Sequence, residues 1–316
     1  MDEIKRCLVT GGAGFIGSHI VDQLLGAGHH VTVVDDLSSG KKENLPENAV
    51  LYEQDICHDL NEIFEKERPQ VVFHEAAQVS VSVSVREPEL DAQLNIMGSI
   101  NVLEHCRRHG VQKVIYAASG AAYGEPESLP LREDGPAHPI SPYGISKFTV
   151  EQYLYGYQRQ FGIQFAALRY ANVYGPRQDP HGEAGVMAIF CERMLKNEQC
   201  VIFGDGEQTR DFVYVEDVAR ANLAVMNASI DASVHPIFNV STQVQTDVNT
   251  IYDLVAKHTG CLMPKQYAGE RPGDVRDSCL ANEKIREHAG WAPEIDPDEG
   301  IRRTVAYFRQ KRQKTV

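Results

Sequence analysis

A glycine-rich turn near the start of the chain constrains the fold more than any other feature of the sequence. Residues 6–25, "RCLVTGGAGFIGSHIVDQLL", are typical of a short apolar strand, a turn containing Gly11, Gly14 and Gly17, and an amphipathic helix. Glycines let the backbone turn tightly and approach a pyrophosphate, whose charge then lies at the positive end of the helix. The pattern therefore predicts a dinucleotide-binding βαβ unit.

The next strand ends in a carboxylate at an informative distance. In residues 29–37, "HHVTVVDDL", Asp35 follows the glycine turn by roughly 20 residues, where an acidic side chain can accept hydrogen bonds from both hydroxyls of the adenosine ribose. A carboxylate at this place also repels a 2′-phosphate. The sequence thus predicts NAD rather than NADP.

Strand-like and helix-like segments alternate through the first half of the chain. This alternation predicts an α/β fold of the Rossmann type, a doubly wound parallel sheet with helices on both faces. The expected strands are residues 6–10, 30–35, 49–55, 70–76, 113–119 and 165–173, and the clearest expected helices are residues 90–110 and 143–162.

The second half of the chain is interrupted by glycine and proline, as in "VYGPRQDPHGEAG" and "GERPGDVRD". We expect an NAD-binding domain at residues 1–171 and a smaller substrate lobe at residues 172–316. The strand-like "PIFNVS" and a helix from about Glu216 to Met226 predict that the chain returns to the main sheet within about residues 211–245. The two domains are therefore expected to interleave.

Composition limits the partners and the compartment. The 316 residues carry a formal net charge of −13, which argues against nucleic acid and membrane surfaces as partners. No apolar run approaches the ~18 residues of a spanning helix, and the polar start "MDEIKR" is unlike a secretory signal. The 7 cysteines show no C-x-x-C pair. These features predict a cytoplasmic protein with reduced thiols.

Two histidines have the spacing of metal ligands on a helix. His105 and His109 flank Arg107 and Arg108, and only Glu104 lies close in sequence as a further ligand. We interpret the segment as a solvated basic helix end, and we expect no metal site.

A tyrosine and a lysine four residues apart provide the chemistry. In "SPYGISKFTVEQ", Tyr143 and Lys147 fall on one face of an expected helix. An ammonium beside a phenol favours the phenolate, so we expect the pKa of Tyr143 to fall toward the pH at which it takes a proton from an alcohol. Ser119, at the end of the strand "KVIYAAS", can share a hydrogen bond with that alcohol and with the phenol.

With these motifs in place, the chain resembles the extended short-chain dehydrogenase/reductase superfamily and, within it, the nucleotide-sugar epimerases of the UDP-glucose 4-epimerase type. The resemblance covers essentially the whole chain. It rests on "TGGAGFIGSH", "VVDDLSSG", "HEAAQVSVSVSVREP", "NIMGSINVL", "SGAAYGEP", "SPYGISK", "LRYANVYGPRQDPHGEAGV", "FGDGEQTRDFVYVEDVA" and "RPGDVR".

The resemblance implies a set of NAD contacts. The implied residues lie around the pyrophosphate, the adenosine, the cofactor path and the nicotinamide: Gly11, Gly14, Phe15, Ile16 and Gly17; Asp35, Asp36, Ser38, Ser39, Gly40, Asp55 and Ile56; Ala76, Ala77, Gln78 and Asn95; Tyr143, Lys147 and Tyr170. It also implies catalysis by Ser119, Tyr143 and Lys147.

The resemblance further implies a nucleotide-sugar site in which Ser119 and Tyr143 contact the sugar. The other implied residues are Asn172, Val201, Phe203, Arg210, Arg271, Asp274 and Ser278. Two arginines suit an acidic protein that binds a diphosphate, because guanidinium meets phosphate oxygens in a bidentate way. Ser278 is in register with the position beside carbon 2 of the sugar, and its small size is expected to admit an N-acetyl group.

The implied activity is inversion of carbon 4 of a UDP-hexose through a 4-keto intermediate, with tightly bound NAD. The implied substrates are UDP-glucose and UDP-galactose, and the small Ser278 extends the expectation to the N-acetylated pair. One departure is "AASGAAYG", where Ser119 is the only hydroxyl residue before the tyrosine and many relatives have two or three.

Other functions remain open. A 4,6-dehydratase starts with the same oxidation but needs an Asp-Glu pair where this chain has Gly120 and Ala121. A UDP-glucuronate 4-epimerase is a second alternative, and a non-catalytic NAD-binding regulator is a third. By analogy with relatives, the helices at about Leu90–Arg108 and Tyr143–Phe161 are expected to form a homodimer interface.

Overall fold

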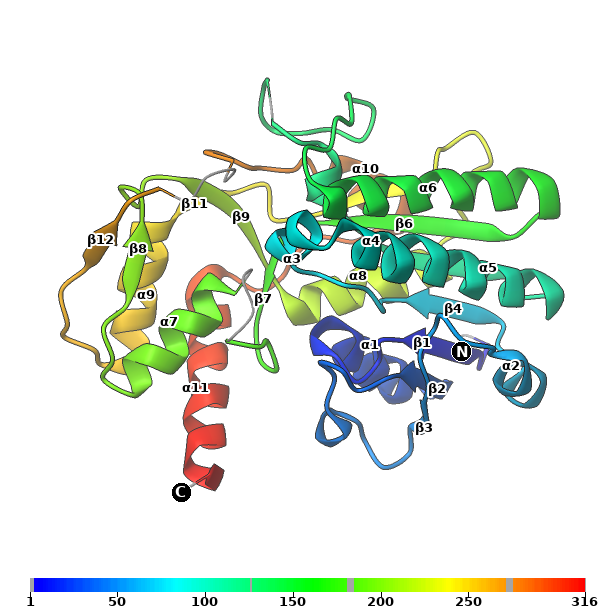
Figure 1. Ribbon diagram of the computed structural model, residues 1–316, viewed down its shortest axis with the longest axis horizontal. Helices are drawn as coiled ribbons and strands as arrows, with labels where there is room; N and C mark the ends of the chain where they lie inside the picture. Colours follow the sequence, from blue (N-terminus) through cyan, green and yellow to red (C-terminus); the bar gives the residue numbers. More distant parts are fainter. Residues whose placement is uncertain (1–2, 126, 181–184, 271–274, 316) are drawn as a thin grey trace.

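The computed structural model describes residues 3–125, 127–180, 185–270 and 275–315, arranged as a main sheet with its helices and a smaller lobe (Figure 1). In chain order the elements are β1 (Arg6–Thr10), α1 (Phe15–Gly26), β2 (His30–Asp35), η1 (Lys42–Asn44), β3 (Val50–Glu53), α2 (Asn61–Glu67), β4 (Val71–His74), α3 (Val81–Arg86), α4 (Pro88–Asp91), η2 (Ala92–Met97), α5 (Gly98–Arg108), β5 (Lys113–Ser119), η3 (Gly120–Ala122), α6 (Pro142–Phe161), β6 (Gln164–Tyr170), β7 (Asn172–Tyr174), α7 (Val186–Leu195), β8 (Val201–Phe203), β9 (Thr209–Tyr214), α8 (Val215–Asn227), β10 (Ile237–Val240), β11 (Gln245–Asp247), α9 (Val248–Thr259), β12 (Gln266–Ala268), α10 (Glu283–Ala289) and α11 (Pro297–Thr315).

The main sheet has seven strands in the order β10-β6-β5-β4-β1-β2-β3, and every pairing within it is parallel. The chain winds outward through β1, β2 and β3, crosses over, and winds the other way through β4, β5 and β6. The winding direction changes between β1 and β4. In open α/β sheets, ligands bind outside the carboxyl ends of the strands at such a point.

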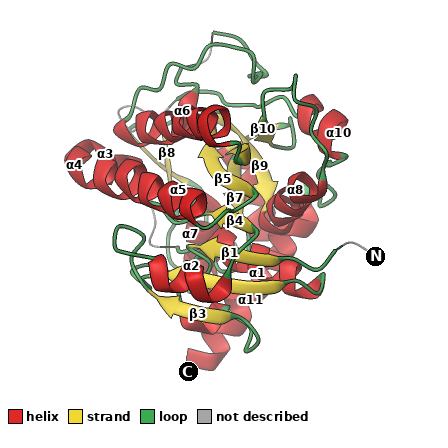
Figure 2. Cartoon of the chain, turned by 90° about the vertical axis from the view of Figure 1, so that its right-hand side faces the viewer, coloured by secondary structure: helices red, strands yellow, loops and turns green. Residues whose placement is uncertain are grey.

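Alternating residues of the strands pack into two hydrophobic cores, one on each face of the sheet. Helices cover both faces (Figure 2). On β1, Cys7 and Val9 pack with residues of α1, α8 and α10, whereas Leu8 packs with residues of α2, α5 and α6. Side chains of a strand alternate between faces, so continuous apolar strands imply helices on both sides. The doubly wound Rossmann-type fold expected from the sequence is confirmed.

A third core holds the lobe together. Its buried side chains come mainly from α7, α9, α11, β7, β8 and β9. A three-stranded sheet in the order β11-β9-β7 and the strand pair β12-β8 complete this part. The lobe lies beside the carboxyl ends of the main strands (Figure 1).

The chain passes between the two parts more than once. Val218 and Val225 of α8 lie in the same core as α1, and β10 pairs with β6 at the edge of the main sheet. Ile285 of α10 and the nearby Trp291 also belong to that core, a second return that the sequence analysis did not predict. The domain boundaries themselves remain a prediction.

Two expected elements differ in detail. The strand expected at residues 165–173 divides at Ala171 into β6, which ends in the main sheet, and β7, which begins the lobe sheet. The helical region expected at about Leu90–Arg108 contains the π-helix η2 between α4 and α5. Single π turns inside helices are frequent at functional sites.

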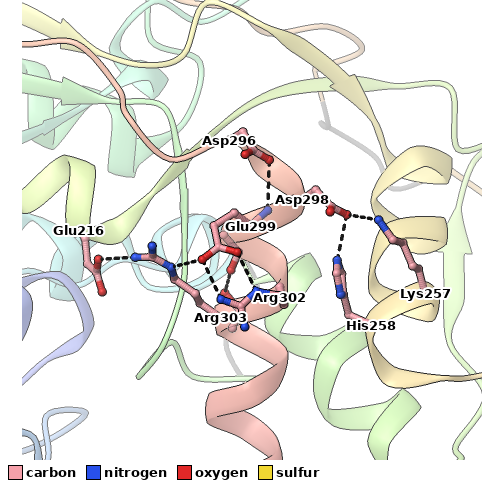
Figure 3. A network of polar contacts seen from close by, with 10 residues as sticks. Glu216, Lys257, His258, Asp296, Asp298, Glu299, Arg302 and Arg303 are labelled. Atoms are coloured by element: carbon pink, nitrogen blue, oxygen red, sulfur yellow. Dashed lines mark hydrogen bonds and ion pairs between the residues drawn. The ribbon is translucent and has the colours of Figure 1, made fainter.

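The start of α11 is fixed by ion pairs to two other helices (Figure 3). Glu299 accepts hydrogen bonds from Arg302 and Arg303, and Arg303 also reaches Glu216 at the start of α8 at 3.1 Å. Asp298 pairs with Lys257 of α9 at 2.8 Å, and His258 adds a contact to the same carboxylate (Figure 3). The network therefore joins the lobe to α8.

The interpretation of His105 as solvated was wrong. The residue is 2% exposed, and its ring lies tilted against Phe64 with the ring centroids 5.5 Å apart. The ring also accepts a hydrogen bond from the Leu60 N–H at 3.3 Å. Packing against α2 removes it from water.

In the described residues no group of three or more His, Cys, Asp or Glu side chains is arranged to hold a metal ion. Nor does the described part of the chain contain a helix with the length and apolar character that crossing a membrane requires.

Candidate active site

The glycine turn leaves space for an anionic group at the first turn of α1. Gly11 has a φ of +66°, and a Cβ on it would lie 2.7 Å from the backbone nitrogen of Ala76. A Cβ on Gly17 would overlap the carbonyl oxygen of Gly11. Gly14 is the N-cap, and no side chain of the described residues caps the helix. The open cradle at the positive helix end fits the pyrophosphate of NAD.

Asp35 lies buried at the carboxyl end of β2, next to this turn. Its carboxylate accepts hydrogen bonds from the N–H groups of Ala13 and Leu37, each at 2.9 Å. Burial raises the pKa of Asp35, and these two hydrogen bonds act in the opposite direction. A Cβ on Gly40 would lie 2.7 Å from an Asp35 oxygen, so the loop closes tightly. Because each carboxylate oxygen has two acceptor positions, ribose hydroxyls can still bind.

The loop after β2 is ordered by its own polar side chains. Asp36 accepts hydrogen bonds from the N–H and the hydroxyl of Ser38, at 3.0 and 2.6 Å. Ser39 is exposed at the tip of the loop. These residues lie beside Asp35, as expected for the adenosine side.

The residues expected to contact adenine follow β3. Asp55 accepts a hydrogen bond from the Cys57 N–H at 2.7 Å. Ile56 is buried, and a Cβ on Gly98 of α5 would lie 2.8 Å from its Cδ1. The glycine at the start of α5 therefore lets this helix approach the Ile56 side chain.

Asn95 holds the segment after β4 in place. Its side-chain oxygen accepts from the Gln78 N–H at 2.8 Å, and its amide nitrogen donates to Gln78 O at 3.0 Å, to Asp91 at 2.9 Å and to Ser146 at 3.2 Å. Asn95 lies in the π-helix, which turns its side chain toward Gln78. The sequence analysis missed Asp91, a buried carboxylate that binds both amide side chains.

Ser119 and Tyr143 come together from two elements. Ser119 ends β5, and its hydroxyl accepts a hydrogen bond from the Ala121 N–H at 3.2 Å. Tyr143 lies in the first turn of α6, where Ser141 caps the helix by accepting from the Gly144 N–H at 3.1 Å. A hydrogen bond joins the side chains of Ser119 and Tyr143. The structure thus brings together the two hydroxyls that the sequence placed on different elements.

Lys147 lies one turn further along α6 and is buried. Its ammonium donates to the carbonyl of Ala117 at 3.0 Å and lies 5.9 Å from the centre of the Tyr143 ring. Burial lowers the pKa of Lys147 to about 8, and the nearby charges of Glu75 and Asp91 act in the opposite direction.

The expectation that Lys147 lowers the pKa of Tyr143 was wrong for the protein alone. Burial raises the pKa of Tyr143 to about 12, and the hydrogen bond with Ser119 is the contact that lowers it. Desolvation disfavours the phenolate more than an ammonium almost 6 Å from the ring centre favours it. A charged catalytic phenolate therefore needs further positive charge in the site.

A chain of hydrogen bonds at the carboxyl edge of the sheet includes Tyr170. The amide of Asn222 in α8 donates to the Tyr170 hydroxyl at 2.8 Å, and that hydroxyl donates to Glu75 at 2.9 Å. Burial raises the pKa of Glu75 to about 7. The sequence analysis missed Glu75; the signal for it was a charged residue directly after the buried strand "VVFH".

Parts of the expected nucleotide-sugar site meet where the lobe strands begin. Arg210 in β9 donates to the carbonyl of Arg276 at 3.1 Å, and the Ser278 N–H donates to Thr209 O at 3.2 Å. Ser278 therefore lies beside the strand of Arg210. The end of β8, at Phe203, is linked to this region because Gln208 donates to the Phe203 carbonyl at 2.7 Å.

Two other residues expected in the nucleotide-sugar site lie at the starts of strands. Val201 lies at the start of β8, and Asn172 begins β7 directly after the chain leaves the main sheet. Arg271 and Asp274 lie outside the described residues.

Asp211 connects this region and was not found from the sequence. It is fully buried, and it accepts hydrogen bonds from the backbone of Thr242, Gln243 and Leu280 at 2.8, 3.0 and 3.2 Å. The Thr242 hydroxyl donates a fourth hydrogen bond to the carboxylate at 2.7 Å. The segment that carries Ser278 is thereby fixed to β9.

A glycine cradle before α1, a carboxylate at the end of β2, a serine at the end of β5, and a tyrosine and a lysine on α6 define an NAD-dependent short-chain dehydrogenase/reductase site of the extended type. The sequence profile described as the NAD dependent epimerase/dehydratase family matches residues 7–241. The chain belongs to this family.

Similar proteins extend over nearly the whole chain. The UDP-glucose 4-epimerase of Mycolicibacterium smegmatis is 44% identical over 315 residues, covering 98% of this chain and 100% of that protein. A crystal structure of UDP-glucose 4-epimerase with UDP-glucose from Thermotoga maritima is 51% identical, has a TM-score of 0.93, and covers 96% and 99% of the two chains. The Thermus thermophilus UDP-glucose 4-epimerase in complex with NAD is 44% identical, with a TM-score of 0.90 and coverage of 96% and 98%.

Proposed function

We propose that the protein is an NAD-dependent UDP-glucose 4-epimerase that interconverts UDP-glucose and UDP-galactose by inverting carbon 4. The observation that carries the proposal is the hydrogen-bonded Ser119–Tyr143 pair with Lys147 at the carboxyl end of β5, in a chain of this family. The relatives named above act on the same nucleotide sugar.

The cofactor residues follow from the geometry of the cradle. We propose that Gly11, Gly14 and residues 15–17 bind the pyrophosphate and that Asp35 binds the adenosine ribose, with the flanking loop residues beside it. Gln78 and Asn95 line the path to the nicotinamide, and Lys147 and Tyr170 lie at its end. When bound, NAD supplies the acceptor and donor of hydride for carbon 4 of the sugar.

The chain's own residues move one proton. Tyr143, as phenolate, takes the proton of the 4-hydroxyl while Ser119 holds that oxygen by a hydrogen bond, and Tyr143 returns the proton when the sugar is reduced on its other face. Since burial raises the pKa of Tyr143 to about 12, the phenolate depends on Lys147 and on the positive charge of the oxidised cofactor.

Between the two half-reactions the 4-keto sugar must rotate so that its opposite face meets the cofactor. The protein therefore has to hold the intermediate through its nucleotide. We propose that the lobe does this through the diphosphate, the uridine and the space around the sugar, with Asn172, Val201, Phe203, Arg210, Arg271, Asp274 and Ser278. The small Ser278 leaves room beside carbon 2, and the enzyme also accepts the UDP-N-acetylhexosamine pair.

The three alternative functions differ in what they require of this site. A 4,6-dehydratase needs an acid and a base after the serine, whereas Gly120 lies against Leu280, where a Cβ would lie 3.3 Å from the leucine side chain. A regulator without activity has no use for the Ser119–Tyr143 hydrogen bond. UDP-glucuronate differs from the hexose only at carbon 6, and direct assay separates it.

Exposed apolar side chains on α4, η2 and α6 support a homodimer that forms through these helices. Leu90, Met97, Ile145, Tyr153 and Phe161 are 41%, 52%, 49%, 40% and 51% exposed on α4, η2 and α6. Apolar side chains gathered on neighbouring helices mark an interaction surface. Light scattering should give twice the mass of one chain, and Tyr153→Glu should give a monomer.

We also propose a cytoplasmic role in galactose metabolism, where the seven free cysteines suit a reducing compartment.

The proposed function is tested by incubating the purified protein with UDP-galactose without added NAD. We expect UDP-glucose to accumulate to a constant ratio with UDP-galactose, as followed by chromatography. UDP-N-acetylgalactosamine and UDP-glucuronate serve as parallel substrates. If UDP-galactose is unchanged even after NAD is added, the proposal is wrong.

A further inference from the structure

The carboxyl group of Glu75 lies between the two halves of the proposed cofactor site, and none of the roles given above uses it. On one side, a Cβ on Gly11 of the glycine turn would lie 3.0 Å from the carbonyl carbon of Glu75. On the other side, Glu75 accepts a hydrogen bond from Tyr170, which is the register partner of Ser119 across β5 and β6. Glu75 is therefore close to both the pyrophosphate cradle and the catalytic strand.

The direction of the hydrogen bonds makes Glu75 an acceptor. Asn222 donates to the Tyr170 hydroxyl at 2.8 Å and to the Val218 carbonyl at 3.0 Å, so the phenol must give its own proton to Glu75 Oε1 at 2.9 Å. Within the described residues no donor reaches the second carboxyl oxygen, and the side chain is partly accessible. One oxygen of a largely desolvated carboxyl thus remains available to a ligand.

Few charged groups lie near Glu75 in the described residues. Lys147 on α6 is the cation that acts on it, and it favours the carboxylate. From α8 the neighbour is the uncharged Asn222, and from the turn after β1 it is the backbone of Gly11. The other titratable groups of this region are His74 in β4, Tyr116 in β5, Tyr143 in α6, Tyr170 in β6 and the buried carboxylate of Asp91 in α4.

We propose that ionised Glu75 is the counter-charge to the positively charged nicotinamide ring of oxidised NAD, and that it stabilises the oxidised cofactor relative to the reduced one. The inference rests on the NAD site of the proposed function. A dinucleotide that extends from the glycine turn to Tyr143 and Lys147 passes the carboxyl ends of β4 and β5, where Glu75 lies. The reduced ring is neutral, so only the oxidised form gains from the carboxylate.

This role serves an enzyme that must end each cycle with oxidised cofactor. A carboxylate that favours the oxidised ring also favours reduction of the 4-keto sugar over its release. Glu75 is in this sense a positioning and electrostatic residue, while Tyr143 moves the proton.

The charge of Glu75 changes within the ordinary pH range, because burial raises its pKa to about 7. A positive ring beside the carboxyl lowers that pKa, whereas the neutral ring leaves it unchanged. Below about pH 7 the reduced complex therefore holds more protons than the oxidised complex. By linkage, preference for the oxidised form rises with pH and levels off above about 7.

Other groups contribute little to this change or contribute equally to parent and variant. The pKa of His74 is lowered to about 3 by burial, and those of Tyr116 and Tyr170 are raised, so these three stay neutral from pH 5 to 8.5. Tyr143, whose phenolate the proposed mechanism ties to the positive ring, is present in the parent and in Glu75→Gln alike. The pKa of Lys147 is lowered to about 8, and loss of its charge acts on both proteins alike.

The test is the partition of bound cofactor. The purified protein is equilibrated with equal concentrations of NAD⁺ and NADH between pH 5 and 8.5, free cofactor is removed by rapid gel filtration, and the two bound forms are quantified by chromatography. In the parent we expect the ratio of bound NAD⁺ to bound NADH to rise ~10-fold toward pH 7, the effect of about one pKa unit. Glu75→Gln, which keeps an acceptor for Tyr170, should lower the ratio ~10-fold at pH 7.5 and flatten its profile below that pH.

Control variants separate charge from structure. Glu133→Gln alters another carboxyl whose pKa is raised by burial, one that accepts from the Asn239 N–H at 2.8 Å outside the cofactor path, and it should leave the profile as in the parent. Tyr170→Phe removes a hydrogen bond that lowers the pKa of Glu75, so its profile should shift to higher pH.

An unchanged ratio in Glu75→Gln overturns the proposal. If this variant does not fold, a flat parent profile between pH 5 and 7 has the same consequence. The epimerase assay is independent of these ratios: a parent that partitions NAD⁺ and NADH as expected but does not convert UDP-galactose removes the proposed function and leaves the role of Glu75 intact.

Discussion

Lys147 donates a hydrogen bond to the backbone carbonyl of Ala117 at 3.0 Å, which ties the helix that carries Tyr143 to the strand that ends in Ser119. The same ammonium lies 5.1 Å from the centre of the Tyr116 ring and 5.9 Å from that of Tyr143. Lys147 therefore positions the catalytic pair as well as supplying charge to it.

Replacing Tyr143 by Phe should reduce turnover by about 10²–10⁴-fold, because the variant keeps the ring but has no group to exchange the proton of the 4-hydroxyl. Affinity for the UDP-sugar, measured by calorimetry, should stay within a few-fold of the parent. Turnover within tenfold of the parent would show that another group is the base.

Replacing Asp35 by Ala should weaken NAD binding by at least ~10-fold, since it removes a charged acceptor for the ribose hydroxyls. It should also relax discrimination against NADP, because the carboxylate that repels a 2′-phosphate is gone. Asp35→Asn keeps the shape of the loop and tests the charge alone. A variant that is purified with as much NAD as the parent would remove Asp35 from the ribose site.

The buried ion pair between Glu151 and Arg169 should be among the largest single contributions to stability near the site. Arg169 donates to both carboxylate oxygens at 2.9 and 2.7 Å, and the side chains are 0% and 3% exposed. Glu151→Gln leaves a buried guanidinium without its counter-charge, so the free energy of unfolding should fall by ~3–5 kcal/mol.

A matched surface variant provides the control for this measurement. Glu192 pairs with Lys196 at 3.0 Å on α7, with side chains 25% and 42% exposed. Glu192→Gln should cost less than ~1 kcal/mol in the same denaturant titration. Equal losses in the two variants would contradict the special weight given to the buried pair.

Most of the correct predictions came from the spacing of residues within short segments of the sequence. The glycine turn, Asp35 and the Tyr143–Lys147 pair lie within short segments whose secondary structure follows from periodicity and turn residues. The alternation of strands and helices likewise predicts the doubly wound parallel sheet, whereas the strand order and the division between β6 and β7 come from the structure. Nothing in the apolar run of residues 165–173 marks the change of sheet at Ala171.

Contacts between distant segments were not predictable. Glu75 and Tyr170 are 95 residues apart, and Asp211 and Leu280 are 69 apart. No periodicity relates such pairs, because they meet only once the sheet and lobe have formed. The burial of Tyr143 is of the same kind: four-residue spacing shows that an ammonium is near, but the desolvation that raises the pKa of the phenol depends on the whole site.

Substrate breadth should depend on Ser278, which is held beside β9 by its backbone hydrogen bond to Thr209 at 3.2 Å. The parent should epimerise both UDP-galactose and UDP-N-acetylgalactosamine. Ser278→Tyr should abolish activity on the N-acetylated sugar and largely spare the plain hexose, because the added ring overlaps only the larger substituent. Ser278→Ala is the size-matched control. Equal losses on both substrates would place the gate elsewhere.

The central claim is that carbon 4 is oxidised and reduced within one active site, with its hydrogen retained. The most direct measurement uses UDP-galactose carrying deuterium at carbon 4, converted in ordinary water without added NAD. We predict UDP-glucose that keeps the deuterium at carbon 4, seen by mass spectrometry and NMR. Product that has exchanged this deuterium for solvent hydrogen would contradict the account.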